Sequence, residues 1–226
     1  MSLLRFDGVG KRFAGSAPAL SEVSFEIEPG EMLFLTGHSG AGKSTLLKLI
    51  HLAERPTQGT ILLEGQNLSQ LKPRRVPYLR RRIGVVFQDH RLLMDRTVHD
   101  NVALPLLIAG QARAEIDKRV RTVLDKVGLA ARERAQPSAL SSGEQQRVGI
   151  ARAMVAQPAL LLADEPTGNL DPQLAAEIMQ LFASLPAQGT AVLVASHDLH
   201  LVRRLRKRVL VLDHGRLIDD FRPVAA

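Results

Sequence analysis

Five short runs of apolar residues recur along the chain, between stretches with helical spacing. Runs in which nearly every residue is apolar are typical of strands that are buried on both faces, as in a parallel sheet covered by helices. They are MLFLT (32–36), IGVVF (83–87), ALLLADE (159–165), TAVLVAS (190–196) and VLVLD (209–213). Because helical segments such as KSTLLKLIHLA alternate with them, the pattern predicts an α/β fold.

The N-terminal part of the chain has a different pattern. In VSFEIE, the apolar residues Val23, Phe25 and Ile27 alternate with polar ones. A period of two predicts a strand that is exposed on one face, which is usual in antiparallel sheets. Pro29 and Gly30 follow this strand and predict a turn. We therefore expect an antiparallel β subdomain ahead of the first buried strand.

The middle third of the chain, 89–157, contains no convincing strand pattern. Within it, EIDKRVRTVLDKVG places its apolar residues on one stripe of a helix, and Gly128 is a typical helix stop. The stripe consists of Ile116, Val120, Val123, Leu124 and Val127. We expect a single domain, 1–226, with a core of approximately 1–88 and 158–226 and a helical subdomain of 89–157.

Composition and charge narrow the classes of partner. The formal net charge of +7 favours an anionic partner, namely a nucleotide, a nucleic acid or lipid head groups. With one tyrosine and no tryptophan, stacking platforms for single-stranded nucleic acid are scarce, and no nucleic acid is expected. The absence of cysteine excludes disulfides and thiolate metal sites.

The basic runs 80–82 and 203–208 indicate solvated helix faces or, alternatively, contacts with an anionic membrane surface. No apolar run approaches the length of a membrane span, so the chain is not expected to cross a bilayer itself.

The segment GHSGAGKST (37–45) matches the phosphate-loop pattern G-x-x-x-x-G-K-[ST]. It lies between a predicted strand and a predicted helix, as the motif requires. Its glycines allow the backbone to curl so that N–H groups surround phosphates. Lys43 offers a positive charge to the β- and γ-phosphates, and the Ser44 hydroxyl is a ligand for Mg²⁺. The residues expected at the nucleotide are Gly37, His38, Ser39, Gly40, Ala41, Gly42, Lys43, Ser44 and Thr45.

A Mg²⁺–nucleotide site also needs a carboxylate near the metal, and LLLADE supplies one at the end of a buried strand. Asp164 is expected to hold Mg²⁺ directly or through water. Glu165 is expected on the opposite side of the strand end, where it activates the attacking water as a general base. Without a phosphate loop in the same chain, the acidic pair would indicate an ordinary turn equally well.

A second helix start with small polar residues occurs at LSSGEQQR (140–147). The free N–H groups of such a start attract an anion, although an ordinary capping box explains the segment equally well in isolation. The segment resembles the signature of ABC-type ATPases, whose usual form is LSGGQ. The resemblance implies a P-loop NTPase fold with a RecA-like core of mixed and parallel strands, an antiparallel β subdomain and a helical insert.

The same resemblance implies a head-to-tail homodimer with two ATP molecules, each held between the phosphate loop of one chain and the signature of the other. The resemblance implies three contacts with the nucleotide across that interface, from Ser141, the N–H of Gly143 and Glu144. Ser142 replaces the second glycine of the motif, and this matters only if its position requires a positive φ.

Further positions match the family in order along the chain. The match implies that Gln88 senses Mg²⁺ and the attacking water, and that His197 hydrogen-bonds the γ-phosphate. Phe13 takes the place of the aromatic residue, often tyrosine, that stacks on adenine. NLD (169–171) matches the loop that crosses the dimer interface, with Asp171 among the nucleotide contacts. The implied catalytic residues are Glu165, His197, Gln88 and Lys43, and the implied ligands of Mg²⁺ are Ser44, Gln88 and Asp164.

Within the family, the segment FQDHRLLMDRTVHDNVALPL (87–106) is most similar to the members that act in bacterial cell division. These members imply a separate integral membrane partner that docks near Gln88 and the helical insert. They also imply a peripheral location on the cytoplasmic face of the inner membrane, at the division septum, and a role in regulating peptidoglycan cleavage. The alternative is the ATPase subunit of a lipoprotein-releasing or macrolide-efflux transporter. A soluble phosphotransferase would share the phosphate loop but lack LSSGEQ and His197.

Overall fold

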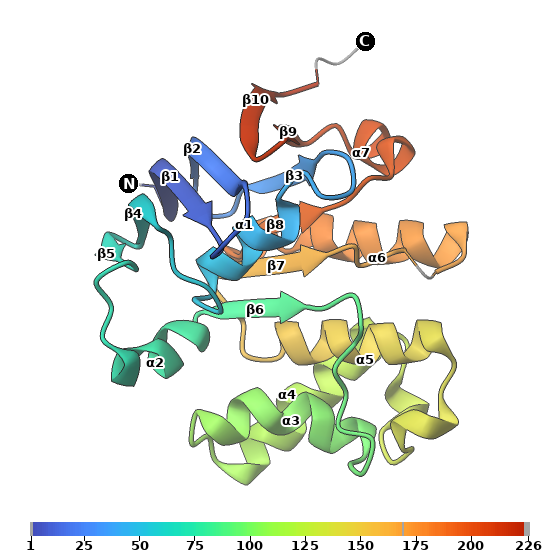
Figure 1. Ribbon diagram of the computed structural model, residues 1–226. Coiled ribbons are helices and arrows are strands. Elements are labelled where there is room, and N and C mark those ends of the chain that lie inside the picture. The colour runs from blue at the N-terminus through green and yellow to red at the C-terminus, as the bar shows by residue number, and fades with distance from the viewer. Residues whose placement is uncertain (1, 169, 224–226) are drawn as a thin grey trace.

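The computed structural model describes residues 2–168 and 170–223, and its larger sheet has six strands (Figure 1). Neighbouring strands are parallel except β10, which pairs antiparallel with β9 at one edge. In spatial order the strands are β10 (Arg216–Phe221), β9 (Arg208–Asp213), β3 (Met32–Thr36), β8 (Ala191–Ala195), β7 (Leu160–Asp164) and β6 (Ile83–Val86). The five apolar runs form the five parallel strands, so that prediction is confirmed.

Alternate residues of the parallel strands pack into two separate cores. In β3, Met32 and Phe34 belong to one core, whereas Leu33 and Leu35 belong to the other. Strands β7 and β8 divide their residues in the same way. The larger sheet is therefore buried on both faces, which explains why its strands are almost continuously apolar.

The smaller sheet is antiparallel and shares one of these cores with the larger sheet. In spatial order its strands are β2 (Pro18–Ile27), β1 (Leu4–Arg12), β4 (Gln58–Leu63) and β5 (Gln66–Asn67). In β2, the apolar residues of VSFEIE are buried and its polar residues are exposed. The half-exposed antiparallel strand predicted there is confirmed.

Helices cover both faces of the larger sheet (Figure 1). Helix α1 (Lys43–Ile50) lies between the two sheets, and its buried apolar residues belong to their shared core. The remaining helices and 3-10 turns are α2 (Val76–Arg80), α3 (Val98–Ile108), α4 (Arg113–Lys126), α5 (Ser142–Met154), α6 (Pro172–Ser184), α7 (Leu199–Leu205), η1 (Pro73–Arg75), η2 (Ala130–Arg132), η3 (Pro137–Ala139) and η4 (Pro186–Gln188). Among the described residues, no helix combines the length and the apolar character that crossing a membrane requires.

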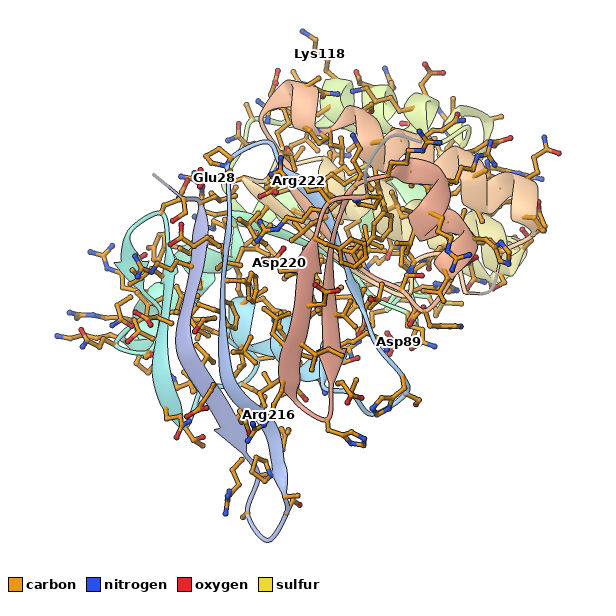
Figure 2. The ribbon with its side chains drawn as sticks, turned by 90° about the horizontal axis from the view of Figure 1, so that it is seen from above. Glu28, Asp89, Lys118, Arg216, Asp220 and Arg222 are labelled. Atoms are coloured by element: carbon orange, nitrogen blue, oxygen red, sulfur yellow. The ribbon has the colours of Figure 1, made fainter. Side chains whose placement is uncertain are left out.

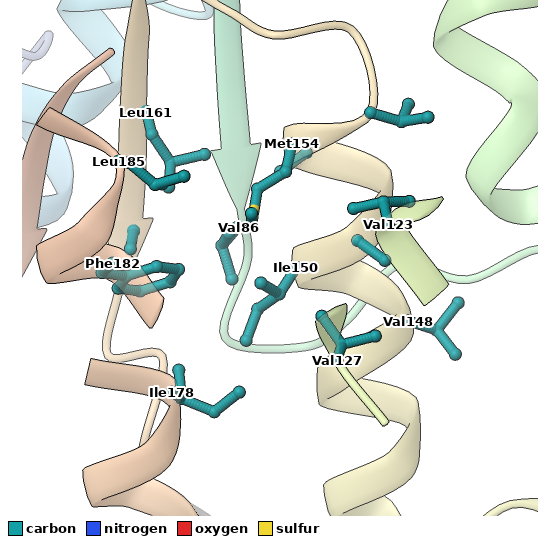
Figure 3. Close-up of a cluster of buried hydrophobic side chains, with 14 of the residues drawn as sticks. Val86, Val123, Val127, Val148, Ile150, Met154, Leu161, Ile178, Phe182 and Leu185 are labelled. Atoms are coloured by element: carbon teal, nitrogen blue, oxygen red, sulfur yellow. The ribbon is translucent and has the colours of Figure 1, made fainter. Parts of the chain in front are cut away.

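The helices α3, α4 and α5 pack together after β6, and residues 89–157 contain no strand. The predicted apolar stripe of α4 is buried, and Gly128 follows the helix with a φ of 67°, as expected for a helix stop. Figure 3 shows Ile150 and Met154 of α5 beside Val86 of β6. Helix α5 thus joins the helical segment to the larger sheet.

Arg208 fixes the edge hairpin formed by β9 and β10. Its guanidinium donates to Asp220 at 2.6 Å and to Glu31 at 3.2 Å, and Arg222 donates to Glu31 at 3.0 Å. Figure 2 labels Asp220 and Arg222, which lie on and just after β10. The hydrogen bond to Asp220 raises the pKa of Arg208 above its ordinary value. These ion pairs hold β10 although most of its side chains are exposed.

Candidate nucleotide-binding and catalytic site

The predicted site residues lie in loops at the carboxyl ends of neighbouring parallel strands. Strand β3 leads into the phosphate loop, β7 ends at Asp164, and β8 ends at Ala195, shortly before His197. Because β8 pairs with both β3 and β7, these loops meet at one edge of the sheet. Gln88 is exposed just beyond the end of β6 at the same edge. This is where open α/β sheets bind their ligands.

The glycines give the phosphate loop its shape. Gly37, Gly40 and Gly42 have φ values of 150°, 81° and 108°, which glycine adopts readily and other residues rarely do. A Cβ atom at Gly37 would overlap the carbonyl oxygen of Leu212 in β9. This glycine therefore also permits the loop backbone to approach the neighbouring strand closely.

Lys43 and the start of α1 complete a site for anions. The Lys43 side chain is buried, and its Nζ donates to the carbonyl oxygens of Gly37 at 2.8 Å and His38 at 3.2 Å. Helix α1 has Gly42 as its N-cap, no side chain bonds to its free N–H groups, and its first turn contains no acidic residue. Such a helix start attracts phosphate. The other loop and first-turn residues of the motif are Ser39, Gly40, Ala41, Ser44 and Thr45.

Asp164 and Ser44 form a pair of oxygen donors beside the loop. Burial raises the pKa of the Asp164 carboxyl, and a hydrogen bond from Ser44 and the charge of Lys43 oppose this shift only in part. A half-buried carboxylate whose desolvation is incompletely compensated favours a nearby cation. Carboxylate, hydroxyl and amide oxygens are the ligands that Mg²⁺ prefers. These two residues fit Mg²⁺, and Gln88, which follows the neighbouring strand, adds an amide oxygen.

Glu165 and His197 contact each other although they follow different strands. The Nδ1 atom of His197 lies 2.9 Å from Oε1 of Glu165, and the N–H of Glu165 donates to Ala195 at 3.0 Å. Glu165 has a φ of 47°, a costly conformation for a non-glycine residue that is frequent at functional sites. Its side chain is 16% exposed, whereas that of His197 is 72% exposed. A sheltered carboxylate with one oxygen held by a histidine is suited to act as a general base.

The signature segment begins α5 with a capping box. The Ser141 hydroxyl accepts from the N–H of Glu144 at 3.2 Å, and the Glu144 carboxylate accepts from the N–H of Ser141 at 2.9 Å. The latter bond lowers the pKa of Glu144. An ionised Glu144 repels phosphate, so a contact between it and a nucleotide requires a hydrogen-bond donor such as a ribose hydroxyl, while Ser141 and the N–H of Gly143 suit a phosphate. Ser142 is the first residue of α5 and its φ is not positive, so it replaces the glycine of the motif without backbone strain.

Phe13 and Asp171 lie on other elements, and both are exposed. Phe13 follows β1, and the Nζ atom of Lys11 lies 4.8 Å from the centre of its ring. Asp171 caps α6, because its Oδ1 accepts from two N–H groups of the first turn at 3.0 and 3.1 Å. Asn169, the first residue of the predicted NLD loop, lies outside the described residues.

The sequence does not predict the role of Gln146, a buried residue that joins two loops of the site. Its Nε2 donates to the carbonyl of Pro166, next to Glu165, at 2.9 Å. Its Oε1 accepts a hydrogen bond from Nδ1 of His90, which lies in the loop that contains Gln88. The sequence signal for the burial of Gln146 is its position one and two helical turns from other buried residues of α5.

Replacement of Gln146 by leucine is expected to lower kcat roughly tenfold to a hundredfold, since a small displacement of a catalytic group has effects of that order. Leucine has a similar volume but cannot bond Pro166 or His90, so the turn that carries Glu165 loses a fixed point. Affinity for ATP should not change, because the phosphate loop is not contacted. Steady-state kinetics and equilibrium titration measure the two quantities, and Gln188→Leu, at an exposed glutamine, is the control. A Gln146→Leu enzyme with normal kcat would contradict this role.

Comparisons with known proteins identify the family of the chain. The sequence model of a family described as ABC transporter matches residues 20–168. The cell division ATP-binding protein FtsE of Escherichia coli (strain K12) is 56% identical over 215 residues, which cover 95% of this chain and 97% of that protein. The protein of the same name from Mycobacterium tuberculosis is 47% identical over 219 residues, which cover 96% of this chain and 95% of that protein.

Solved structures of ATP-binding cassettes have the same fold as this chain. A dimeric, post-hydrolysis state of the ATP-binding cassette MJ0796, bound to ADP and Pi, has a TM-score of 0.91 and 32% identity, covering 99% of this chain and 100% of that one. CbiO1 from Clostridium perfringens, part of the ABC transporter complex cbiONQ, has a TM-score of 0.90 and 30% identity, covering 98% of this chain and 89% of that one. The predicted fold class and the resemblance to ABC-type ATPases are thus confirmed. The chain belongs to the ABC transporter family and, within it, to the group of the cell division ATP-binding proteins FtsE.

Proposed function

We propose that the protein binds and hydrolyses ATP as the ATPase subunit of a cell-division membrane complex. The observation that carries the hydrolytic part of this proposal is the Glu165–His197 contact beside the phosphate loop, because it places a general base at the edge of the sheet where phosphate is expected. The similarity to the FtsE proteins supports the cell-division part. The partner is an integral membrane protein resembling FtsX, on the cytoplasmic face of the inner membrane at the division septum. ATP-driven dimerisation there regulates the hydrolysis of septal peptidoglycan.

Each residue of the site has its own role in the proposed hydrolysis. Lys43 exchanges the carbonyl oxygens of its own loop for oxygens of the β- and γ-phosphates and so neutralises part of their charge. Glu165 accepts a proton from the water that attacks the γ-phosphorus, and the bond to ADP breaks. His197 holds one oxygen of Glu165 through Nδ1 and leaves the other oxygen to the water, and its second ring nitrogen is the one proposed for the γ-phosphate. Mg²⁺, when bound, shields the charge of the phosphates. The residues that would hold it are Ser44, Asp164 and Gln88.

The arrangement of the helix starts favours a homodimer. Helices α1 and α5 pack on opposite faces of the larger sheet (Figure 1), so the signature at Ser141 is not positioned over the phosphate loop of its own chain. Two chains placed head to tail bring each signature to the other chain's phosphate loop. Ser141 and the N–H of Gly143 then contact the γ-phosphate, and Phe13 stacks on the adenine. The MJ0796 cassette is dimeric in its post-hydrolysis state, which supports this arrangement.

A groove next to the Gln88 loop suits a segment of the membrane partner. It has a volume of about 640 Å³, and apolar residues such as Phe87, Pro105 and Ile108 contribute to its lining. Ile108 is 56% exposed. The arginines that line the groove are Arg80, Arg81, Arg91, Arg119 and Arg152. An apolar surface with basic residues around it fits an amphipathic helix that carries acidic side chains.

Replacement of Ile108 by aspartate is expected to reduce co-purification of the membrane partner about tenfold or more, which corresponds to about 1.4 kcal/mol. The carboxylate removes an apolar contact and repels acidic side chains of the partner. Basal ATP hydrolysis should be unaffected. Ile218→Asp, at an exposed isoleucine of β10, is the matched control. Unreduced recovery would refute docking in this groove. Mass spectrometry of the captured protein tests the rest: a lipoprotein-releasing or macrolide-efflux permease in place of an FtsX-like protein would overturn the cell-division role.

A further inference from the structure

Three potential metal ligands meet at the rim of the phosphate loop, and the proposed hydrolysis does not use them as a group. His38 belongs to the loop, Asp213 ends β9, and His214 is in the turn between β9 and β10. The Nε2 atom of His38 lies 3.1 Å from Oδ1 of Asp213, and Nε2 of His214 lies 3.9 Å from the same oxygen. The three ligand atoms all lie within 4.8 Å of one another.

The hydrogen bonds of His38 leave one of its nitrogens in need of a cation. Its Nδ1 lies 2.6 Å from the carbonyl oxygen of Ser39, and since that oxygen only accepts, Nδ1 must carry the hydrogen. In a neutral imidazole, Nε2 then presents a lone pair to the carboxylate of Asp213, and the two acceptors repel each other. A proton or a metal ion bound to Nε2 converts this repulsion into attraction. An Nδ1–H bonded to a backbone carbonyl is also the usual way in which proteins orient a histidine that binds metal through Nε2.

The distances suit a tetrahedral ion of the zinc type. With bonds of about 2.0–2.1 Å, two ligand atoms of a tetrahedral Zn²⁺ lie about 3.3 Å apart, close to the separation between His38 and Asp213. The His214 side chain is 83% exposed and its ring centre lies 4.8 Å from that of His38, so a small rotation of an exposed side chain suffices to bring its nitrogen nearer. Two imidazoles and one carboxylate suit Zn²⁺, whereas Mg²⁺ prefers oxygen ligands throughout.

The backbone holds these ligands in place. The N–H of Gly215 donates to the carbonyl of Ala41 in the phosphate loop at 3.0 Å, and the N–H of Ser21 donates to Gly215 at 2.8 Å. His214 and Gly215 have φ values of 44° and 78°, so the turn is tight. The turn lies directly before Arg216, which Figure 2 labels at the end of the hairpin. The backbone positions of the three ligands are thus held by hydrogen bonds, and ion binding orders the exposed His214 side chain.

We propose that His38, Asp213 and His214 bind one Zn²⁺ ion per chain at the rim of the phosphate loop, at a site separate from the Mg²⁺ position at Ser44 and Asp164. The fourth ligand of the ion is water. The ion supplies the positive charge that the facing His38 and Asp213 side chains require, and it links the phosphate loop to the β9–β10 turn.

The test uses the full chain without a polyhistidine tag, with excess Mg²⁺ to occupy the oxygen site. Calorimetric titration with Zn²⁺ is expected to give one site per chain. His214→Asn should weaken Zn²⁺ binding at least tenfold, because asparagine accepts the left-handed turn but offers no imidazole. Asp213→Asn should weaken it as well. His200→Asn, at an exposed histidine of α7, is the control and should bind as the wild type does.

A second measurement addresses the geometry. Co²⁺ in place of Zn²⁺ should give the intense visible absorption of a four-coordinate ion in the wild type, and this absorption should be absent from His214→Asn. Absence of Zn²⁺ binding by the wild type, or equal binding by the wild type and His214→Asn, would overturn the proposal. Thermal unfolding of the variants confirms that each is folded when it is measured.

Discussion

Lys43→Ala is expected to abolish tight ATP binding. The Lys43 ammonium is buried at the mouth of the loop, where its 2.8 Å and 3.2 Å bonds to loop carbonyls keep it in position for phosphate oxygens. Each hydrogen bond to a charged group contributes about 1.5–3 kcal/mol, so loss of two bonds to the β- and γ-phosphates should raise the Kd for ATP by about two to four orders of magnitude.

Equilibrium titration with a fluorescent ATP analogue measures this Kd. Lys48→Ala is the matched control, because Lys48 is an exposed lysine in the last turn of the same helix. It should bind ATP as the wild type does. Thermal unfolding should show that Lys43→Ala is folded, since alanine is favourable in a helix. A folded Lys43→Ala protein with near-normal affinity would show that the loop does not bind the triphosphate through this lysine.

A strand or helix is predictable from the sequence where the pattern of its own residues reflects which of its faces are buried. The parallel strands are predicted because both faces of each are buried, which makes the runs continuously apolar. Strand β10 is not predicted: RLIDDF is mostly exposed, and the strand depends on pairing with β9 and on the Arg208–Asp220 ion pair. Strand β4 is not predicted either, because its pairing with β1 joins segments that are far apart in the sequence. Contacts of this kind leave no local pattern.

The candidate site divides in the same way. The phosphate loop is one continuous segment, and so is the Asp164–Glu165 pair, so residue types and spacing predict each of them. The contact between Glu165 and His197 depends on the adjacency of β7 and β8, and resemblance to a family identifies His197 where spacing does not. Gln146 is not identified because one polar residue in a helix usually faces solvent, whereas tertiary packing buries this one.

Glu165→Gln is expected to bind ATP normally and to hydrolyse it about a hundredfold to ten-thousandfold more slowly, the range typical of the loss of a general base. Glutamine keeps the shape of the side chain, and its Oε1 still accepts a hydrogen bond from Nδ1 of His197, so the φ of 47° and the surrounding turn are retained. Only the capacity to accept a proton from water is lost. Because ATP then persists between the phosphate loop of one chain and the signature of the other, the dimer should accumulate.

Phosphate release measures the rate, and size-exclusion chromatography with light scattering, in ATP and Mg²⁺, measures the mass. Glu177→Gln, at an exposed glutamate of α6, is the control and should hydrolyse ATP at the wild-type rate without trapping a dimer. The two readouts separate two claims. Fast hydrolysis by Glu165→Gln would remove Glu165 from the role of general base. If hydrolysis is slow but the measured mass is that of a monomer, Glu165 keeps its role as general base and the shared site is refuted. One chain would then hold ATP without the signature at Ser141 of a second chain.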